Sequence, residues 1–325
     1  MSDATTHTGG VLQGVSSAKT YARRALKGAL IGVNAVGAYV LLGMILTERI
    51  NDDPGFAPPI VTEGGLASVD MVAAVIEREV GETAWVANDP FFLPGAHLGN
   101  MRAYQEGVIY ALSRFSLEMA DRLGRERGTT RVDPDLDQAA GLLRFPGDVW
   151  HFVFDSSWAP TVTSEAQYLA AARALRSYNE RIASGAAVFT PRRDNLFAAI
   201  SRIEADISSK ANVLVAHVER VAAGEPVRSA ARNVFYSTKG RLYGYLMVLR
   251  ALGEDFEPVI EREGLTLVWN RLLANLENAA VMHPFILADS APGSLFVASH
   301  TSELGFFALR AKTQLRDVMG VLGEN

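Results

Sequence analysis

The chain has 325 residues, of which 49% are hydrophobic, and its 31 basic and 36 acidic side chains leave a formal net charge of −5. A protein that binds nucleic acid presents a basic surface, so this charge balance speaks against that class. The chain contains no cysteine, which excludes a disulfide scaffold, a zinc–thiolate site and a cysteine nucleophile. Composition alone therefore removes several classes of function and points to none.

The most informative segment is the uncharged run GALIGVNAVGAYVLLGMILT at residues 28–47. About 20 apolar residues, at about 1.5 Å each, span the hydrocarbon core of a bilayer, which is about 30 Å thick. A cleaved signal peptide has a shorter apolar region followed by a small-x-small cleavage site, whereas this run stays apolar beyond its small residues. A buried core helix would show a polar edge. We therefore predict a transmembrane anchor at 28–47.

The residues that flank this run predict its orientation. Basic residues gather before it, and acidic residues dominate after it; the basic ones are Lys19, Arg23, Arg24 and Lys27. Positive residues stay on the cytoplasmic side, so residues 1–27 are predicted to be a cytoplasmic tail. Everything after Thr47 is then expected on the far face of the membrane, which in a bacterium is the periplasm.

Three residues within the run predict contact with another helix. Gly28 and Gly32 form a small-x-x-x-small pair, which lets a second helix approach closely. Asn34 places an amide in an apolar segment, where an interhelical partner is favoured. The expected partners are other membrane proteins or a second copy of this chain. The alternative is that glycines are simply frequent in membrane helices.

After the anchor, residues 48–66 are rich in proline, glycine and acidic side chains, which is typical of an extended stalk. Residues 67–325 then show apolar residues at helical spacing, with capping residues at several starts, such as the capping box Ser164 to Gln167. The predicted helices cover residues 68–80, 98–123, 134–145, 164–185, 190–224, 230–252, 257–263, 265–282 and 301–322.

These elements predict an all-α fold: one N-terminal transmembrane helix followed by a multi-helix bundle domain at 67–325. At most one small β-hairpin is expected. Its best candidate strands are residues 285–288 and 295–298, which flank a Pro-Gly turn.

No recognised catalytic, nucleotide-binding or metal-binding motif occurs in the sequence. The six histidines lack the H-E-x-x-H spacing of metal ligands. There is no G-x-S-x-G nucleophile elbow, no P-loop, and no G-x-G-x-x-G that follows a strand. We therefore expect neither a metal nor a cofactor.

Two segments rich in aromatic residues interrupt the predicted helices, WVANDPFFLPGAHLGN at 85–100 and FPGDVWHFVFDSSWAP at 145–160. Turns would hold Phe91 and Phe92 on the first segment, and Trp150 and Trp158 stand on the second. One interpretation is a partner-binding surface, since aromatic residues on rigid loops anchor interfaces. The other, which ordinary core composition favours, is that these loops close the ends of the bundle and bury their aromatic side chains.

Three carboxylates lie in or near the second aromatic segment: Asp148, Asp155 and Glu165. A glycan hydrolase places two carboxyl groups about 5–10 Å apart. These residues are therefore the candidate catalytic groups if the chain is an envelope or cell-wall hydrolase. Helix capping explains Asp155 and Glu165 equally well.

Five segments in this order after an anchor carry a family resemblance: NDPFFLPG at 88–95, GNMRAYQEGVIYALSRF at 99–115, SEAQYLAAARALRSYN at 164–179, FTPRRDNL at 189–196 and VFYSTKGRLYGYLMVLRAL at 234–252. The chain resembles an uncharacterised family of single-span proteobacterial proteins that is catalogued as a domain of unknown function. The resemblance covers nearly the whole chain after residue 66. It implies an inner-membrane protein with a helical periplasmic domain, and it brings no activity, cofactor or catalytic residue.

Together these features predict a non-enzymatic, membrane-anchored periplasmic protein whose helical domain binds or scaffolds an assembly of membrane proteins. The first alternative is the hydrolase just described. The second is a sensor domain that binds an apolar ligand within the bundle.

Overall fold

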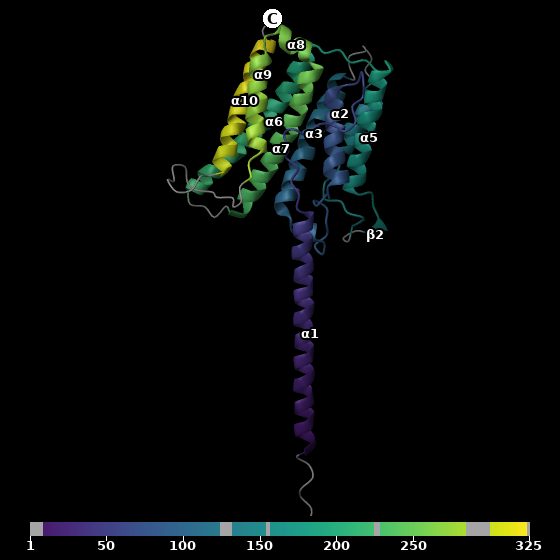
Figure 1. The fold of residues 1–325 in the computed structure, drawn as a ribbon, viewed down its shortest axis with the longest axis vertical. Helices are drawn as coiled ribbons and strands as arrows, with labels where there is room; N and C mark the ends of the chain where they lie inside the picture. Colours follow the sequence, from purple (N-terminus) through teal and green to yellow (C-terminus); the bar gives the residue numbers. More distant parts are fainter. Residues whose placement is uncertain (1–8, 124–131, 154–156, 224–227, 284–299, 324–325) are drawn as a thin grey trace, which may run out of the picture. The chain divides into compact units, whose positions relative to one another are not determined.

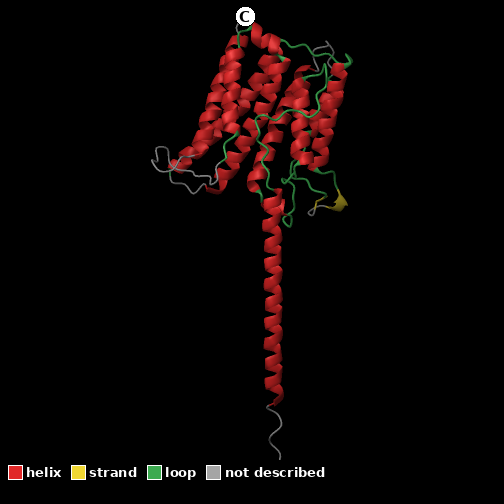
Figure 2. Cartoon of the chain, in the orientation of Figure 1, coloured by secondary structure: helices red, strands yellow, loops and turns green. Residues whose placement is uncertain are grey.

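The structure is a computed structural model that describes residues 9–123, 132–153, 157–223, 228–283 and 300–323. The chain divides into two compact units, Met1–Thr47 and Glu48–Asn325. Helices make up nearly all of the regular structure in the described residues (Figure 2). The predicted all-α fold class is confirmed.

The described part of the first unit is one helix, α1 (Gly9–Thr47). Within it, Arg23–Thr47 is the one stretch among the described residues that is long and apolar enough to cross a bilayer, and its most apolar window is entirely unburied. Both a membrane anchor and a signal sequence fit that description. The helix begins well before the predicted span, because residues 9–27 contain no proline and residues 18–27 are mostly the strong helix formers alanine, lysine, arginine and leucine.

The second unit is built from helices joined by loops (Figure 1). In chain order these are α2 (Ala67–Ile76), the π-helical turn η1 (Glu77–Glu82), the 3-10 turn η2 (Pro94–His97), α3 (Gly99–Leu123), α4 (Pro134–Leu142), α5 (Ser164–Ala183), α6 (Arg193–Ala222), α7 (Arg228–Asp255), α8 (Glu257–Arg262), α9 (Thr266–Ala280) and α10 (His300–Gly323).

Helices α3 and α7 form the centre of this unit (Figure 1). Helices α2, α4 and α5 pack on one side of the pair, and α6, α9 and α10 pack on the other. The largest side chains that are fully buried include Tyr104 on α3 and Phe235, Tyr243 and Tyr245 on α7. The core of the unit therefore lies along the α3–α7 contact.

Glycines allow α3 and α7 to approach at backbone distance. A Cβ atom on Gly240 would lie 2.1 Å from the carbonyl oxygen of Tyr104, and one on Gly107 would lie 2.4 Å from that of Ser237. Both distances are far below van der Waals contact. Only hydrogen can occupy these two positions, so the glycines set the separation of the two central helices.

One short hairpin occurs among the described residues. Strand β1 (Phe152–Val153) pairs antiparallel with β2 (Ser157–Pro160), with Phe152 opposite Pro160. The hairpin expected at 285–288 and 295–298 lies outside the described residues. The capping box expected at the start of α5 is wrong: Thr163 caps this helix by accepting a bond from the N–H of Ala166, and the Ser164 hydroxyl bonds elsewhere.

Residues 48–66 have no helix or strand, yet they are not the free stalk that the sequence suggested. They belong to the second unit. Thr62 donates from its N–H and its hydroxyl to the Asp70 carboxylate, at 2.6 and 3.0 Å, and the N–H of Leu66 donates to Asn179 at 2.6 Å. Proline, glycine and acidic residues kept this segment irregular, but its polar groups are bonded to the domain rather than left to water.

We expect Gly240→Ala to destabilise the protein by at least 1–3 kcal/mol, the usual cost of overpacking a core. The new methyl group would press against a backbone carbonyl of α3, which has no rotamer to change. Gly141→Ala is the matched control, because a Cβ atom there meets nothing within 4 Å; it should be neutral or gain up to about 1 kcal/mol. Urea unfolding of the full chain in mild detergent, followed by circular dichroism, measures both. Equal stability of the two variants would contradict the close approach.

Candidate functional site

Four aromatic side chains form a connected cluster on the surface of the second unit. The ring centroids of Phe91 and Phe92 lie 5.5 Å apart, those of Phe92 and Trp150 5.8 Å, and those of Trp150 and Phe152 5.8 Å, all in edge-to-face geometry. Phe91 is 81% exposed, Phe92 45% and Phe152 39%, while Trp150 is half-buried. We call these four residues the aromatic platform. Exposed rings in mutual contact are typical of a binding surface.

The two loops that carry the platform are bonded to each other. Trp85 donates from its indole nitrogen to the carbonyl of Gly147 at 2.9 Å, and the Asn88 amide donates to the carbonyl of Val149 at 2.9 Å. The hydroxyl of Ser164, at the start of α5, accepts from the N–H of Val149 at 3.0 Å. The platform therefore stands on a base that is fixed to the bundle.

The first loop folds tightly beneath Phe91. A Cβ atom on Gly95 would lie 2.0 Å from a carboxylate oxygen of Asp89 and 2.9 Å from a methyl group of Val86. Glycine is thus the residue that lets η2 close over Asp89. A ring nitrogen of His97 lies 3.1 Å from the carbonyl oxygen of Phe91, which holds the tip of the loop.

The aromatic residues of the two predicted loops differ in how far they are buried. Phe91 and Phe92 are exposed, and Trp150 joins them. Trp85, only six residues before Phe91, is buried and packs edge-to-face on Tyr168 at 5.4 Å. The expectation that these loops bury their rings is therefore right for Trp85 and wrong for the platform. The side chain of Trp158 lies outside the described residues.

The structure describes two of the three candidate carboxylates, and the two differ in exposure. Asp148 is exposed and Glu165 is half-buried, while Asp155 lies outside the described residues. Glu165 accepts a bond of 2.6 Å from the Asn88 amide. Sequence reasoning missed Asp89: burial, and the nearby charge of Glu165, raise the pKa of the Asp89 carboxyl to about 6. The Glu165 charge therefore acts on a carboxyl group in the loop that carries Phe91 and Phe92.

A cleft of about 390 Å³ opens beside α3. Its lining comes from α3, from the loop after α4, from Trp85 and from Tyr168 on α5, and it includes Tyr110, Arg114, Arg144 and Phe145. Within the bundle, the apolar cavity next to Phe115 and Phe256 has only about 30 Å³, room for about two water molecules. Among the described residues, no group of three or more histidine or acidic side chains could hold a metal ion.

The segment that enters the second unit, residues 51–56, is held mainly through its backbone carbonyls. The Arg78 guanidinium and the Tyr104 hydroxyl both donate to the carbonyl of Asn51, at 2.9 and 2.8 Å. The Tyr243 hydroxyl donates to the carbonyl of Asp53 at 3.0 Å. We call residues 51–56 the entry segment.

A buried ion pair fixes the same segment. Lys239 is completely buried on α7, and its ammonium group donates to the carboxylate of Asp52, which is 8% exposed. His283 approaches that carboxylate at 3.2 Å from the solvent side. Burial lowers the pKa of Lys239, and the Asp52 charge opposes that effect. The lysine has one buried counter-charge among the described residues, so losing Asp52 would leave the Lys239 charge buried without a partner.

A second buried pair lies beside it at the start of the π-helical turn η1. Arg78 donates to Glu79 at 2.8 Å and to the Tyr243 hydroxyl at 2.8 Å, and it stacks over the ring of Phe56 at 4.3 Å. Burial raises the pKa of Glu79, and Arg78 counteracts this effect. No sequence motif indicated these roles: Arg78 and Glu79 are adjacent, but Tyr243, which Arg78 also binds, is 165 positions away in the chain.

The predicted membrane contact residues do not share one face of α1. Gly28 and Gly32 are four residues apart and lie on the same side. Asn34 lies two residues beyond Gly32, about 160° around the helix axis. Its amide donates to the carbonyl of Leu30 at 2.7 Å. The three residues therefore define two faces of α1, one with the glycines and one with Asn34.

Comparison with protein families gives one match. A family model described as an uncharacterized protein conserved in bacteria (DUF2333) matches residues 62–231, slightly more than half of the chain. The chain belongs to this family. The DUF2333 match runs from before α2 into α7, so it includes both platform loops but ends before residue 252, where the resemblance in the sequence ends. No curated protein and no solved structure matches the chain.

In this DUF2333 protein, Asp52→Ala should cost about 3–5 kcal/mol of stability, because it leaves the buried Lys239 charge without its partner. Adding Lys239→Met should restore much of the loss, since the second change removes the uncompensated charge. Asp53→Ala is the control: its side chain is exposed, and the loss should stay within about 1 kcal/mol. Urea unfolding measures all three. A double variant no more stable than Asp52→Ala would contradict this role for the pair.

The raised pKa of Asp89 predicts a pH-dependent stability. The folded protein binds this proton more tightly than the unfolded chain, where the ordinary pKa is 3.8. The resulting stabilisation is fully present below about pH 4 and is lost as the pH rises through about 6. Asp89→Asn removes this effect, so the variant should gain on the order of 1 kcal/mol over the parent between pH 4 and 7, allowing for solvent screening. A stability difference that is constant with pH in urea unfolding would refute it.

Proposed function

We propose that this protein is a membrane-anchored scaffold of the bacterial inner membrane, with no catalytic activity of its own. Its anchor would be Arg23–Thr47, its tail cytoplasmic, and its helical unit would bind or hold a membrane-protein assembly at the periplasmic surface. The observation that carries the proposal is the unburied apolar surface of α1. Apolar side chains in such number need a non-aqueous environment, and a bilayer supplies one at this length.

The two faces of α1 support a scaffold rather than a bare anchor. The face with Gly28 and Gly32 has no side chain to keep a neighbouring helix away. The Asn34 amide uses one donor within its own helix, and an amide also has a second donor and an acceptor for a neighbour. Two different faces allow two neighbouring helices at once, which is what holding an assembly together requires.

A hydrolase is the second candidate, favoured by the carboxyl groups of Asp89 and Glu165. A carboxyl group whose pKa is near 6 keeps its proton close to neutral pH, as a general acid must. In that case Asp89 and Glu165, rather than the expected set with Asp148, would be the reacting groups. Asp89→Asn and Glu165→Gln would each abolish glycan hydrolysis in purified full-length protein. The sensor hypothesis has less support, since the apolar cavity of about 30 Å³ is a tenth of a typical ligand site.

Co-purification tests the scaffold. The full chain, tagged at its C-terminus and extracted in mild detergent, should bring a stoichiometric membrane complex identifiable by mass spectrometry. Gly32→Leu and Asn34→Leu should each weaken that association by about 3- to 30-fold, equivalent to about 0.6–2 kcal/mol per contact. Val33→Leu is the control, since it keeps the span apolar and lies about 100° around the helix axis from both Gly32 and Asn34. If the double variant keeps every partner, or if the parent protein has none, the scaffold proposal fails.

A further inference from the structure

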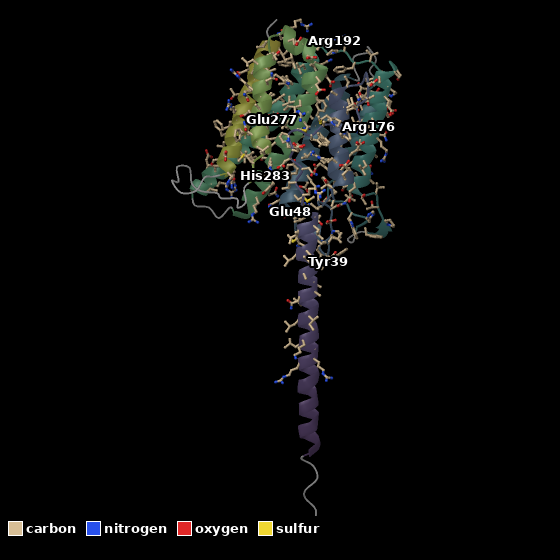
Figure 3. All side chains as sticks on the ribbon, in the orientation of Figure 1. Tyr39, Glu48, Arg176, Arg192, Glu277 and His283 are labelled. Atoms are coloured by element: carbon tan, nitrogen blue, oxygen red, sulfur yellow. The ribbon has the colours of Figure 1, made fainter. Side chains whose placement is uncertain are left out.

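The aromatic platform lies at the end of the second unit where the chain enters it. Figure 3 labels Glu48 at the lower end of this unit, and Figure 1 shows β2 at the same end. Strand β2 pairs with β1, whose Phe152 belongs to the platform. The entry segment and the exposed rings therefore lie at the same end of the bundle.

We propose that the aromatic platform inserts into the interfacial layer of the bilayer, and that its occupant is lipid rather than protein. The inference rests on the proposed membrane anchoring. Three residues, 48–50, separate the end of α1 from Asn51, whose carbonyl is bonded to Arg78 and Tyr104. Four residue steps of extended chain span at most about 14 Å. If α1 crosses the membrane, this end of the bundle stays close to the bilayer surface.

The chemistry of the platform fits the membrane–water interface. Tryptophan is enriched there because its ring is apolar while its N–H reaches water, and phenylalanine supplies apolar area. The four platform residues include no carboxylate and no ammonium group. The exposed carboxylate of Asp148, two residues before Trp150, would repel anionic lipids. The contact should therefore depend on ring insertion and not on charge, so that added salt leaves it unchanged.

The size of the platform also favours lipid. A stable protein interface takes about 20–30 residues on each side, whereas the platform offers four. A weak contact becomes effective when a covalent tether keeps it near its target, because the effective concentration is then in the millimolar range. The entry segment provides that tether, since its carbonyls and Asp52 are fixed within the unit.

Tryptophan quenching in vesicles tests the proposal directly. The chain has four tryptophans and none in α1; Trp85 and Trp269 are buried, so Trp158→Phe leaves Trp150 as the reporter. Full-length protein is reconstituted in phosphatidylcholine that is brominated near the glycerol end of its acyl chains. We expect Trp150 emission to be lost there, kept in unbrominated vesicles, and lost equally at low and high salt.

Two variants make the result specific. Phe91→Ser with Phe92→Ser should restore most of the Trp150 emission, because the rings that carry the platform into the lipid are gone. Phe306→Ser is the matched control, since Phe306 is 57% exposed on α10 and has no contact with the platform. Near-ultraviolet circular dichroism confirms that each variant is folded.

The other outcomes are distinct. If an alkaline carbonate wash releases the protein from membranes, the anchoring itself fails and the proposed function with it. If the protein stays in the membrane but Trp150 is not quenched, only the lipid contact is overturned. If Trp150 is shielded from aqueous acrylamide in native membranes and yet unquenched in brominated vesicles, the occupant of the platform is a protein, and the lipid assignment is wrong.

Discussion

The close approach of α3 and α7 is the constraint on which the second unit depends. Because Gly107 and Gly240 have no side chains, the backbones of α3 and α7 approach so closely that only a hydrogen atom fits between them at these positions. This contact brings the rings of Tyr104 and Tyr243 to 6.0 Å from each other. The two hydroxyls then bind carbonyl groups of the entry segment that are two residues apart, those of Asn51 and Asp53. A larger residue at either glycine would separate the tyrosines and loosen everything that they hold.

Helix positions were predictable because each helix repeats an apolar spacing within its own sequence. The predicted 98–123 helix matches α3 (Gly99–Leu123), and the end predicted for α5 falls within two residues of Ala183. These are local properties, and periodicity records them directly. The same reasoning cannot give contacts between distant residues. Asp52 and Lys239 are separated by 187 positions. Composition therefore predicted that Asp52 lies in an extended stalk, whereas its segment is bound to the domain.

Burial of the aromatic residues was the least predictable property of the candidate site. Trp85 and Phe91 lie in one short loop with similar hydrophobicity, yet the first fills the core and the second is exposed. The difference arises from tertiary hydrogen bonds, such as that from Trp85 to Gly147, which orient the loop. The π-helical turn that begins at Glu77 could not be predicted either, since it extends α2 without any break in the sequence pattern.

The binding of residues 51–56 also decides where the domain begins as a folding unit. The family match starts at residue 62, a natural place to cut a soluble fragment. Such a fragment would lose the carbonyls that Arg78, Tyr104 and Tyr243 bind, and it would leave Lys239 buried without Asp52. Donors buried without acceptors are costly. The smallest autonomous version of this domain therefore has to start at or before Asn51, so the irregular segment that leads from α1 serves as an internal ligand of the fold.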